Sequence, residues 1–366
     1  MREQKVDKFF LILVMSLVLG GFFIFISASM GLLVKDGASF GSVAGNQALL
    51  GLLGGLMSMV ILSKINYKDW KKYSFYLFIA SIVLTALVFI PQIGLEHNGA
   101  KRWILLGSFS FQPSELLKLG SVLYAAAFFA GIKDRITTVR WGLLPLVGIL
   151  AVVGTVILKQ PDIGTYLVIF VAVLSMFLIA GGKWRHILAI VVISAIGFVF
   201  LVYQKPYLAE RIEVFINPYS DPTGSGWQIR QALISIGSGG IFGKGFGQSI
   251  QKFSFLPEPI GDSVFAVAAE EFGFVGGLAI IIAFFLFLWR GFHIAKNVPD
   301  KFGGLLALGI VIIIAFQSFI NIASMLGVFP LTGVPLFFIS HGGTAMFFAL
   351  SAVGIVLNIS RHCRLS

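Results

Sequence analysis

The sequence predicts an all-α integral membrane protein with about ten transmembrane helices, and its composition and recurring apolar runs carry that prediction. Of the 366 residues, 57% are hydrophobic and 12% are charged, whereas soluble domains carry roughly a quarter charged residues. Apolar runs long enough to cross about 30 Å of hydrocarbon recur along the chain. The 42 glycines suit closely packed membrane helices, because small residues let backbones approach. This composition excludes a disordered chain, a coiled coil and an ordinary soluble enzyme, and residues 1–366 are predicted to form one membrane domain.

Each predicted span is an apolar run bounded by charged or helix-breaking residues. The first has a basic flank and ends at Ser27-Ala28-Ser29, which resembles a signal-peptide cleavage site, but its apolar stretch is too long for a signal peptide. The last opens on a segment with two prolines and several glycines, which predicts broken backbone beside protein or a cavity. In chain order the ten spans are Phe9–Ser29, Asn46–Ser63, Tyr73–Pro91, Pro113–Gly131, Gly142–Leu158, Gly164–Ala180, His186–Tyr203, Ser263–Trp289, Phe302–Met325 and Leu336–Ile359.

The distribution of Lys and Arg predicts the orientation of these spans. The formal net charge is +11, and in so apolar a chain this excess indicates the positive-inside rule rather than nucleic-acid binding. One set of short flanks holds only Lys35, Lys101, Arg102 and Lys159. The opposite set is therefore cytoplasmic and includes both termini; it holds Arg2, Lys5, Lys8, Lys64, Lys68, Lys71, Lys72, Lys133, Arg135, Arg140, Lys183, Arg185, Arg290, Lys296, Lys301, Arg361 and Arg364.

The polar, chemically varied segments lie on the predicted outer side, at residues 92–112, 159–163 and 204–262. The last is the longest loop, and a long loop in a compact protein is usually functional. Within it, the sequence GSGGIFGKGFG lacks the spacing of a nucleotide-binding phosphate loop, because Ser238 stands where the first glycine belongs. This motif predicts a Gly-rich turn with one cation, Lys244.

Two charges lie inside the fourth span. Glu115 and Lys118 are three residues apart, shortly after Pro113, a residue that fits the first turn of a helix. Their spacing places both on one helix face, and ionisable groups within a membrane normally pair or face a cavity. Both interpretations stay open here: a structural ion pair, or the wall of an outer polar cavity.

Short outer loops carry further candidates. Lys101 and Arg102 precede Trp103 and are either interfacial anchors or a clamp for a phosphate-bearing substrate, since Arg binds phosphate through two N–H groups. Asp162 precedes the sixth span, where a carboxylate can cap the helix N-terminus.

Asp262 ends the long outer loop, four residues after Glu258 and next to Gly261. It is either a helix N-cap or an outer-face general base. In a helix that starts at Asp262, Glu270 lies about 80° round from it and can share its side, whereas Glu271 cannot. His341, near the start of the last span, is expected to be a packing residue.

Taken together, these segments resemble the SEDS family of membrane glycosyltransferases that polymerise peptidoglycan (FtsW, RodA, SpoVE). The resemblance covers nearly the whole chain, and the order of the segments is more specific than any one of them. The Asp221-Pro222, Gly226-Trp227-Gln228 and Gln248–Lys252 segments are more similar to FtsW than to RodA. The matching segments are Ala100–Ile104, Phe111–Lys118, Asn217–Pro222, Gly224–Gln228, Gln231–Gly247, Gln248–Lys252, Leu256–Gly273 and Gly342–Thr344. The chain departs from the family at His341, where a tyrosine is usual.

The resemblance implies a catalytic role for Asp262 and lipid II as the substrate, polymerised by an inverting reaction at the outer face of the bacterial cytoplasmic membrane, in cell division. It implies a class B penicillin-binding protein and other division proteins as partners. Divalent cations, Mg or Mn, support activity in the family, but no ligand cluster specifies a metal site. The alternatives are a lipid II flippase and an elongation polymerase of the RodA type. The candidate substrate-binding residues are Lys101, Arg102, Gln112, Glu115, Lys118, Asp162, Lys244 and Glu258.

Overall fold

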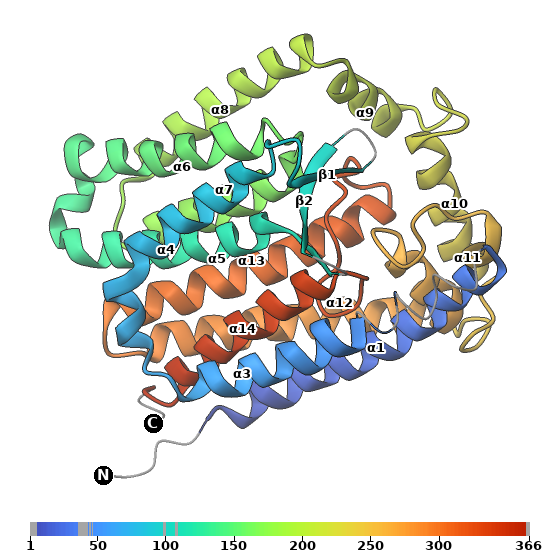
Figure 1. The fold of residues 1–366 in the computed structure, drawn as a ribbon, viewed down its shortest axis with the longest axis horizontal. Coiled ribbons are helices and arrows are strands. Elements are labelled where there is room, and N and C mark those ends of the chain that lie inside the picture. Colours follow the sequence, from blue (N-terminus) through green and yellow to red (C-terminus); the bar gives the residue numbers. More distant parts are fainter. Residues whose placement is uncertain are drawn as a thin grey trace.

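The computed structural model describes residues 6–35, 43, 45, 47–97, 100–106 and 109–363, and helices account for most of them. The predicted all-α membrane fold is confirmed. The long helices lie roughly alongside one another in a bundle (Figure 1). They are α1 (Lys8–Lys35), η1 (Gln47–Gly54) continued by α3 (Gly55–Lys64), α4 (Tyr67–Leu87), α5 (Pro113–Ile132), η3 (Val139–Leu143) continued by α6 (Leu144–Ile157), α7 (Ile163–Ile179), α8 (Trp184–Gln204), α12 (Val264–Asn297), α13 (Lys301–Met325) and α14 (Gly343–Ser360).

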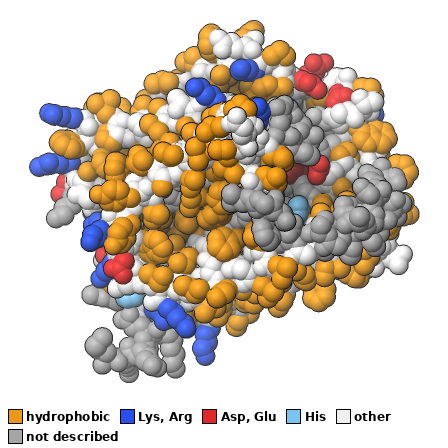
Figure 2. All heavy atoms as spheres, viewed as in Figure 1, with side chains coloured by type: hydrophobic (Ala, Val, Ile, Leu, Met, Phe, Trp, Pro, Cys, Tyr) orange, Lys and Arg blue, Asp and Glu red, His pale blue; other side chains and the backbone are white. Residues whose placement is uncertain are grey.

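Eight of the described helices are long and apolar enough to cross a membrane by length and composition. The two predicted spans outside that set coincide with α7, an apolar helix of 17 residues, and with α4, whose first turns carry Asp69 and three lysines. Hydrophobic side chains cover the middle of the visible face, and Lys and Arg side chains gather along the edge nearest the termini (Figure 2). This arrangement suits a polytopic membrane protein.

The two ends of the bundle differ in content. Both termini lie at one end, the terminal end, where the Asp7 carboxylate pairs with Arg290 at 2.7 Å and the Asp7 backbone N–H donates to Ser360. The opposite end, the loop end, carries the shorter elements: β1 (Gly94–His97), β2 (Ala100–Leu106), β3 (Phe109–Phe111), α9 (Pro206–Ile216), α10 (Ser225–Ser238) and α11 (Gln251–Ser254). A short turn, η2 (Lys133–Thr137), joins α5 to η3.

Helix α13 lies at the centre of the bundle, and α8 lies at its edge (Figure 1). In the most apolar part of α13, 89% of the residues are buried, compared with 11% in α8. Helices α5, α7, α12 and α14 all pack against α13. The site described below forms where these helices and their connections meet at the loop end.

Three features differ from the sequence prediction. Residues 92–112 contain a three-stranded antiparallel sheet, with β2 between β1 and β3, where only a loop was expected. The last helix begins at Gly343 rather than Leu336, because Phe338 and Gly342 have positive φ angles that a helix cannot accommodate. Helix α12 extends to Asn297, eight residues beyond the predicted Trp289, and is interrupted at Gly273, where φ is 67° and ψ is −165°.

Candidate active site

Asp262 lies at the loop end, directly before α12. Ser263, not Asp262, is the residue that precedes the first helical turn, and α12 has no side-chain cap. The N-cap interpretation of Asp262 is therefore wrong. Its backbone carbonyl instead accepts a hydrogen bond from Asn321 on α13 at 2.9 Å, and its side chain is half-buried. This leaves the carboxylate for chemistry rather than for helix capping.

The connection between α13 and α14, residues 326–342, forms one wall beside Asp262. Asn321 also donates to the Val334 carbonyl at 2.9 Å, so one amide side chain holds both segments. Ser340 donates to the Gly261 carbonyl at 2.8 Å. Gly333 lies so close that a Cβ atom there would approach Asp262 Oδ2 to 3.5 Å. The backbone on either side of the carboxylate is thus fixed by side chains of the bundle core.

Backbone strain is concentrated around this carboxylate. The non-glycine residues with positive φ in the described chain are Pro161, Glu258 and Phe338, at 28°, 48° and 67°. Each belongs to a segment that borders Asp262: the α6–α7 connection, the end of the long loop and the α13–α14 connection. For Glu258 and Phe338 such conformations cost about 1–3 kcal/mol each and persist where surrounding structure enforces them, often at functional sites.

Four charged side chains act on Asp262: Glu258, Arg102, Arg211 and Asp162. Burial raises the pKa of the Asp262 carboxyl to about 6, Glu258 acts in the same direction, and the two arginines oppose it. A carboxylate with this pKa is ionised at neutral pH and is a stronger base than an ordinary aspartate. The surroundings therefore suit proton abstraction next to a bound anion.

Arg102 is held in place by the connection that precedes α7. Its guanidinium donates to the carbonyls of Gln160, at 3.2 Å, and of Pro161. Two of its five N–H donors are thereby used, and the others can serve an anionic ligand. Lys101 is the preceding residue on β2, where the pairing with β1 is irregular: Trp103 pairs with Leu95 and Lys101 with Glu96, so Arg102 is the extra residue between them. Of the two cations, Arg102 is among the charges that act on Asp262, and the Lys101–Arg102 clamp stays a prediction.

Asp162 caps α7, as one interpretation of the sequence predicted. Its carboxylate accepts a hydrogen bond from the Thr165 backbone N–H at 3.1 Å, and the side chain is buried. Two residues later, Gly164 packs against Thr332 and Val334, where a Cβ atom would come within 2.6 Å of Val334. This close approach brings the start of α7 to the wall beside Asp262.

Arg211 completes the cluster and was missed by the sequence analysis. It lies on α9, a short helix that begins with Pro206 and carries Tyr207 on the same side. Burial and the neighbouring Arg102 lower the pKa of the Arg211 guanidinium, while Asp162 and Asp262 favour its charged form. The available signal was weak, because Arg211 is one of several cations in a loop of nearly sixty residues and lies outside the segments that resemble the family.

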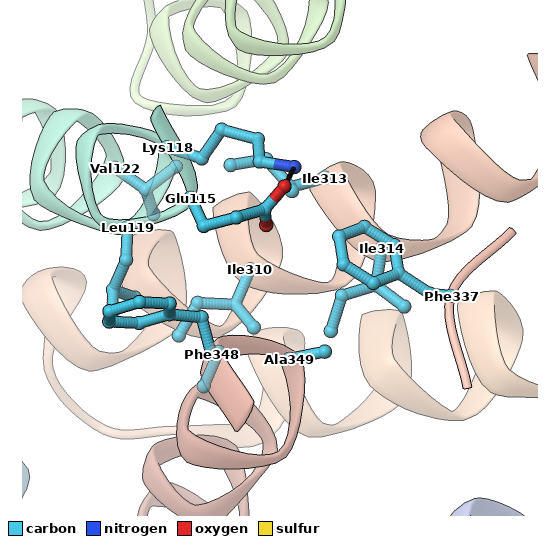
Figure 3. Close-up of a pocket in the computed structure, with 11 residues that line it drawn as sticks. Glu115, Lys118, Leu119, Val122, Ile310, Ile313, Ile314, Phe337, Phe348 and Ala349 are labelled. Atoms are coloured by element: carbon cyan, nitrogen blue, oxygen red, sulfur yellow. Dashed lines mark hydrogen bonds and ion pairs between the residues drawn. The ribbon is translucent and has the colours of Figure 1, made fainter. Parts of the chain in front are cut away.

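Glu115 and Lys118 form the predicted interior pair. Lys118 Nζ lies 2.8 Å from Glu115 Oε1, both side chains are 3% exposed, and Lys118 also donates to Gln317 of α13 at 2.7 Å. They line a small pocket of about 20 Å³ whose other walls are apolar, with Phe337 opposite the pair (Figure 3). Lys118 lies 4.8 Å from the centre of the Phe337 ring.

This pair supports the wall beside Asp262. Gln317, which accepts from Lys118, donates to the Pro335 carbonyl at 3.0 Å. A chain of polar contacts therefore runs from α5 through α13 to the α13–α14 connection. Gln112, the residue before α5, is buried, and its backbone carbonyl accepts from the Glu115 N–H at 3.2 Å.

Lys244 pairs with Glu270 at 2.7 Å and is not among the groups that act on Asp262. The condition under which Glu270 could share the side of Asp262 is not met, because α12 starts only at Val264, and Glu270 instead bonds to Ser235, Ser249 and the Ile250 N–H. The Gly-rich loop therefore binds to α12. Lys244 stays a predicted substrate-binding residue, and it is not one of the charged groups around Asp262.

The chain matches a family model described as "Cell cycle protein", the FtsW, RodA and SpoVE model, over residues 7–365. The chain belongs to this family. It is 42% identical over 310 residues to stage V sporulation protein E of Bacillus subtilis strain 168, covering 85% of each chain. It is 38% identical over 368 residues to the probable peptidoglycan glycosyltransferase FtsW of Trichlorobacter lovleyi, covering 100% of this chain and 96% of that protein.

Solved structures of this family have the same fold. A chain in a structure described as "Structural coordination of polymerization and crosslinking by a peptidoglycan synthase complex" superposes with a TM-score of 0.82 at 29% identity, covering 99% of both chains. The rod shape determining protein RodA of Thermus thermophilus gives a TM-score of 0.69 at 28% identity, covering 99% of this chain and 98% of that one. The predicted resemblance to the SEDS family is confirmed.

Two further sequence predictions concern this member of the FtsW/RodA/SpoVE family. His341 stacks on Phe25, with ring centres 6.1 Å apart, and its backbone N–H donates to the Ile260 carbonyl at 2.6 Å, so it packs as expected. The described residues contain no group of three or more His, Cys, Asp or Glu that could hold a metal ion. We derive no catalytic step through a metal, and dependence on Mg or Mn stays a prediction.

Proposed function

We propose that this chain is a peptidoglycan glycosyltransferase that polymerises lipid II, with Asp262 as the general base. The observation that carries the proposal is a half-buried carboxylate with a pKa of about 6, placed at the loop end beside Arg102 and Arg211. The names of its FtsW relatives support the reaction class. We assign the terminal end to the cytoplasm and the loop end to the outer face of the bacterial cytoplasmic membrane, in line with the excess of basic flanks.

The arrangement supports a single displacement. The 4-hydroxyl of the acceptor sugar attacks the anomeric carbon of the donor, and Asp262 takes the hydroxyl proton as the new glycosidic bond forms. The bond to the undecaprenyl pyrophosphate breaks with its electron pair on the leaving oxygen. Arg102 and Arg211 stabilise the charge that grows there. The α-linked donor becomes a β-linked product, so one carboxylate suffices and no covalent enzyme intermediate forms.

The proposed partner is a class B penicillin-binding protein that crosslinks the new strands, acting with other division proteins. A structural relative belongs to a complex described as coordinating polymerization and crosslinking, which supports such a partner. We place this chain in cell division, because the Gln248–Lys252 segment is more similar to FtsW than to RodA. The elongation role is the alternative, and depletion in cells distinguishes them by filamentation or by loss of rod shape.

The test is strand synthesis from lipid II by purified chain with its partner, comparing Asp262→Asn with the wild type. We expect Asp262→Asn to lower the rate by about 10²–10⁴ because Asn cannot accept the proton. Asp262→Glu should recover little, since one added methylene displaces the carboxylate from the reacting hydroxyl. The matched control is Asp221→Asn, the same change on the same loop at a half-buried aspartate that bonds only local N–H groups.

Near wild-type synthesis by a folded Asp262→Asn protein would exclude the general-base role. A melting curve and co-purification with the partner check that the variant is folded and assembled. The flippase alternative makes a different prediction, because polymer formed in detergent requires no bilayer. The charged residues that act on Asp262 lie at the loop end. A transporter with alternating access places its binding site near the middle of the membrane, so this position favours polymerisation.

A further inference from the structure

A large groove opens at the terminal end of the bundle, away from Asp262. It lies between the end of α7, the end of α12 and the start of α13, and measures about 700 Å³. Neither the proposed reaction nor any sequence motif uses it. Apolar side chains form most of its wall, and Lys296 and Lys301 stand at its mouth; the apolar residues include Leu178, Ile179, Phe292, Leu308 and Ile312.

The depth of the groove matches one leaflet of a membrane. Along α13 the lining runs from Lys301 to Ile312, and a helix rises about 1.5 Å per residue, which gives about 16 Å. Half of a hydrocarbon core about 30 Å thick is about 15 Å. A ligand with charge at the level of Lys301 would therefore place an acyl chain of ordinary length along the whole wall.

The mouth of the groove is positively charged. Lys296 and Lys301 are both exposed, and Lys183 and Arg185 follow α7 at the same end. The groove lining also contains the acidic residue Asp300. Its carboxylate already accepts hydrogen bonds from the Gly303 N–H at 2.9 Å and from the Tyr67 hydroxyl.

The apolar wall is incompletely covered by the chain itself. Ile179 is 67% exposed and Phe292 is 41% exposed. Helix α8, which follows α7, is mostly unburied and makes few contacts with its neighbour α7. The groove thus combines an exposed apolar wall with a cationic mouth, and an amphiphile with an anionic head satisfies both.

We propose that this groove binds one anionic glycerophospholipid of the cytoplasmic leaflet, with its phosphate at Lys296 and Lys301 and an acyl chain along α13. The proposal uses the orientation assigned above and is otherwise independent of the catalytic role of Asp262. Basic pockets between transmembrane helices on the cytoplasmic side bind such headgroups, and a lysine facing anionic lipid contributes about fivefold to binding.

The test is native mass spectrometry of delipidated, detergent-purified chain titrated with phosphatidylglycerol or phosphatidylcholine of identical acyl chains. We expect one bound lipid per chain and a preference for phosphatidylglycerol on the order of 30-fold, from two lysines. Lys296→Gln with Lys301→Gln should abolish the preference. The matched control is Lys64→Gln with Lys68→Gln, which removes two exposed lysines at the same end but outside the groove.

A second variant tests the apolar wall. Ile179→Trp fills the mouth from an already exposed position and should weaken binding of both lipids without disturbing the core. Equal binding of the two lipids by the wild-type chain would overturn the proposal, as would an unchanged preference in the Lys296/Lys301 variant. Displacement by glycerol phosphate as effective as that by whole lipid would contradict docking of the acyl chain.

Discussion

At the scale of single residues, the charges around Asp262 determine the pH at which it can act. As the general base it must be ionised, and its pKa of about 6 exceeds the usual value of about 3.9. We therefore expect kcat/KM for strand synthesis to fall as the pH drops through about 6, because protonation of the free enzyme removes the base.

Two variants that each neutralise one charge should shift the midpoint of this fall in kcat/KM at low pH in opposite directions. Glu258→Gln removes the negative charge that raises the pKa and should lower the midpoint, whereas Arg211→Gln removes a cation that lowers it and should raise the midpoint. The measurement is the pH profile of lipid II polymerisation for the wild type and both variants. Identical midpoints in all three proteins would show that another group controls this fall.

Sequence reasoning reached some of these residues and not others, for physical reasons. Asp262 and Asp162 were found because each follows a polar stretch and precedes an apolar run, a position visible in the sequence. Arg211 was not found, because only the fold brings α9 over the start of α7. Asn321 looks like any polar residue of a span until its amide is seen to hold Asp262 and Val334 together.

At the scale of elements, the backbone of the Gly-rich loop after α10 forms hydrogen bonds with α12 at the point where that helix is interrupted. The break at Gly273 exposes helix backbone groups, and the N–H groups of Lys244 and Gly245 donate to Glu270 and Glu271 at 3.0 and 2.9 Å. In return, the Phe274 N–H donates to Gly240 at 2.8 Å. The glycines that resemble a phosphate loop allow the backbone of this loop to lie directly against the backbone of α12.

This docking predicts different effects for two glycines of similar φ. A Cβ at Gly243 (φ +81°) would lie 2.1 Å from the Glu271 carbonyl, whereas at Gly247 (φ +79°) it would meet open space. Gly247→Ala should cost about 1–2 kcal/mol, from positive φ alone. Gly243→Ala should cost more and should reduce synthesis as well. Thermal unfolding of both variants measures this, and equal losses would contradict the docking.

The same loop is held by an ion pair that the sequence analysis did not anticipate. Lys252 Nζ lies 2.7 Å from Glu271, both side chains are fully buried, and Ser27 of α1 donates to the same carboxylate at 2.6 Å. The partners are nineteen residues apart and the hydroxyl comes from another helix, so no local spacing reveals the contact.

The Glu115–Lys118 pair is an element-scale link whose energy can be measured. Either Glu115→Gln or Lys118→Met leaves one buried charge unpaired and should destabilise the protein by about 3–5 kcal/mol. The double change should cost less than the sum, because both charges are gone. A double-mutant cycle from unfolding measurements gives the coupling, and additive effects would disprove it.

At the scale of the whole molecule, apolar runs were sufficient to predict the fold class but not every boundary. Composition and periodicity locate the helices because each must cover about 30 Å of hydrocarbon. They do not reveal the sheet β1–β3, whose strands are three to seven residues long. Nor do they place the start of α14, which depends on how residues 336–342 pack against Gln47 and Ile260.

The last prediction concerns orientation, with ten spans and both termini in the cytoplasm. In a Cys363→Ser background, which removes the single native thiol, cysteine at Ser220 lies on the exposed long loop, and cysteine at Lys68 lies in the first turn of α4 at the terminal end. An impermeant maleimide added to intact cells should label the first and not the second, and permeabilised cells should label both.

This expectation follows from the basic flanks, which are retained on the cytoplasmic side during insertion. The basic residues gather at the terminal end, where Asp7 contacts Arg290 and Ser360. Labelling of Lys68→Cys with protection of Ser220→Cys in intact cells would reverse the orientation and place Asp262 on the side away from the growing wall.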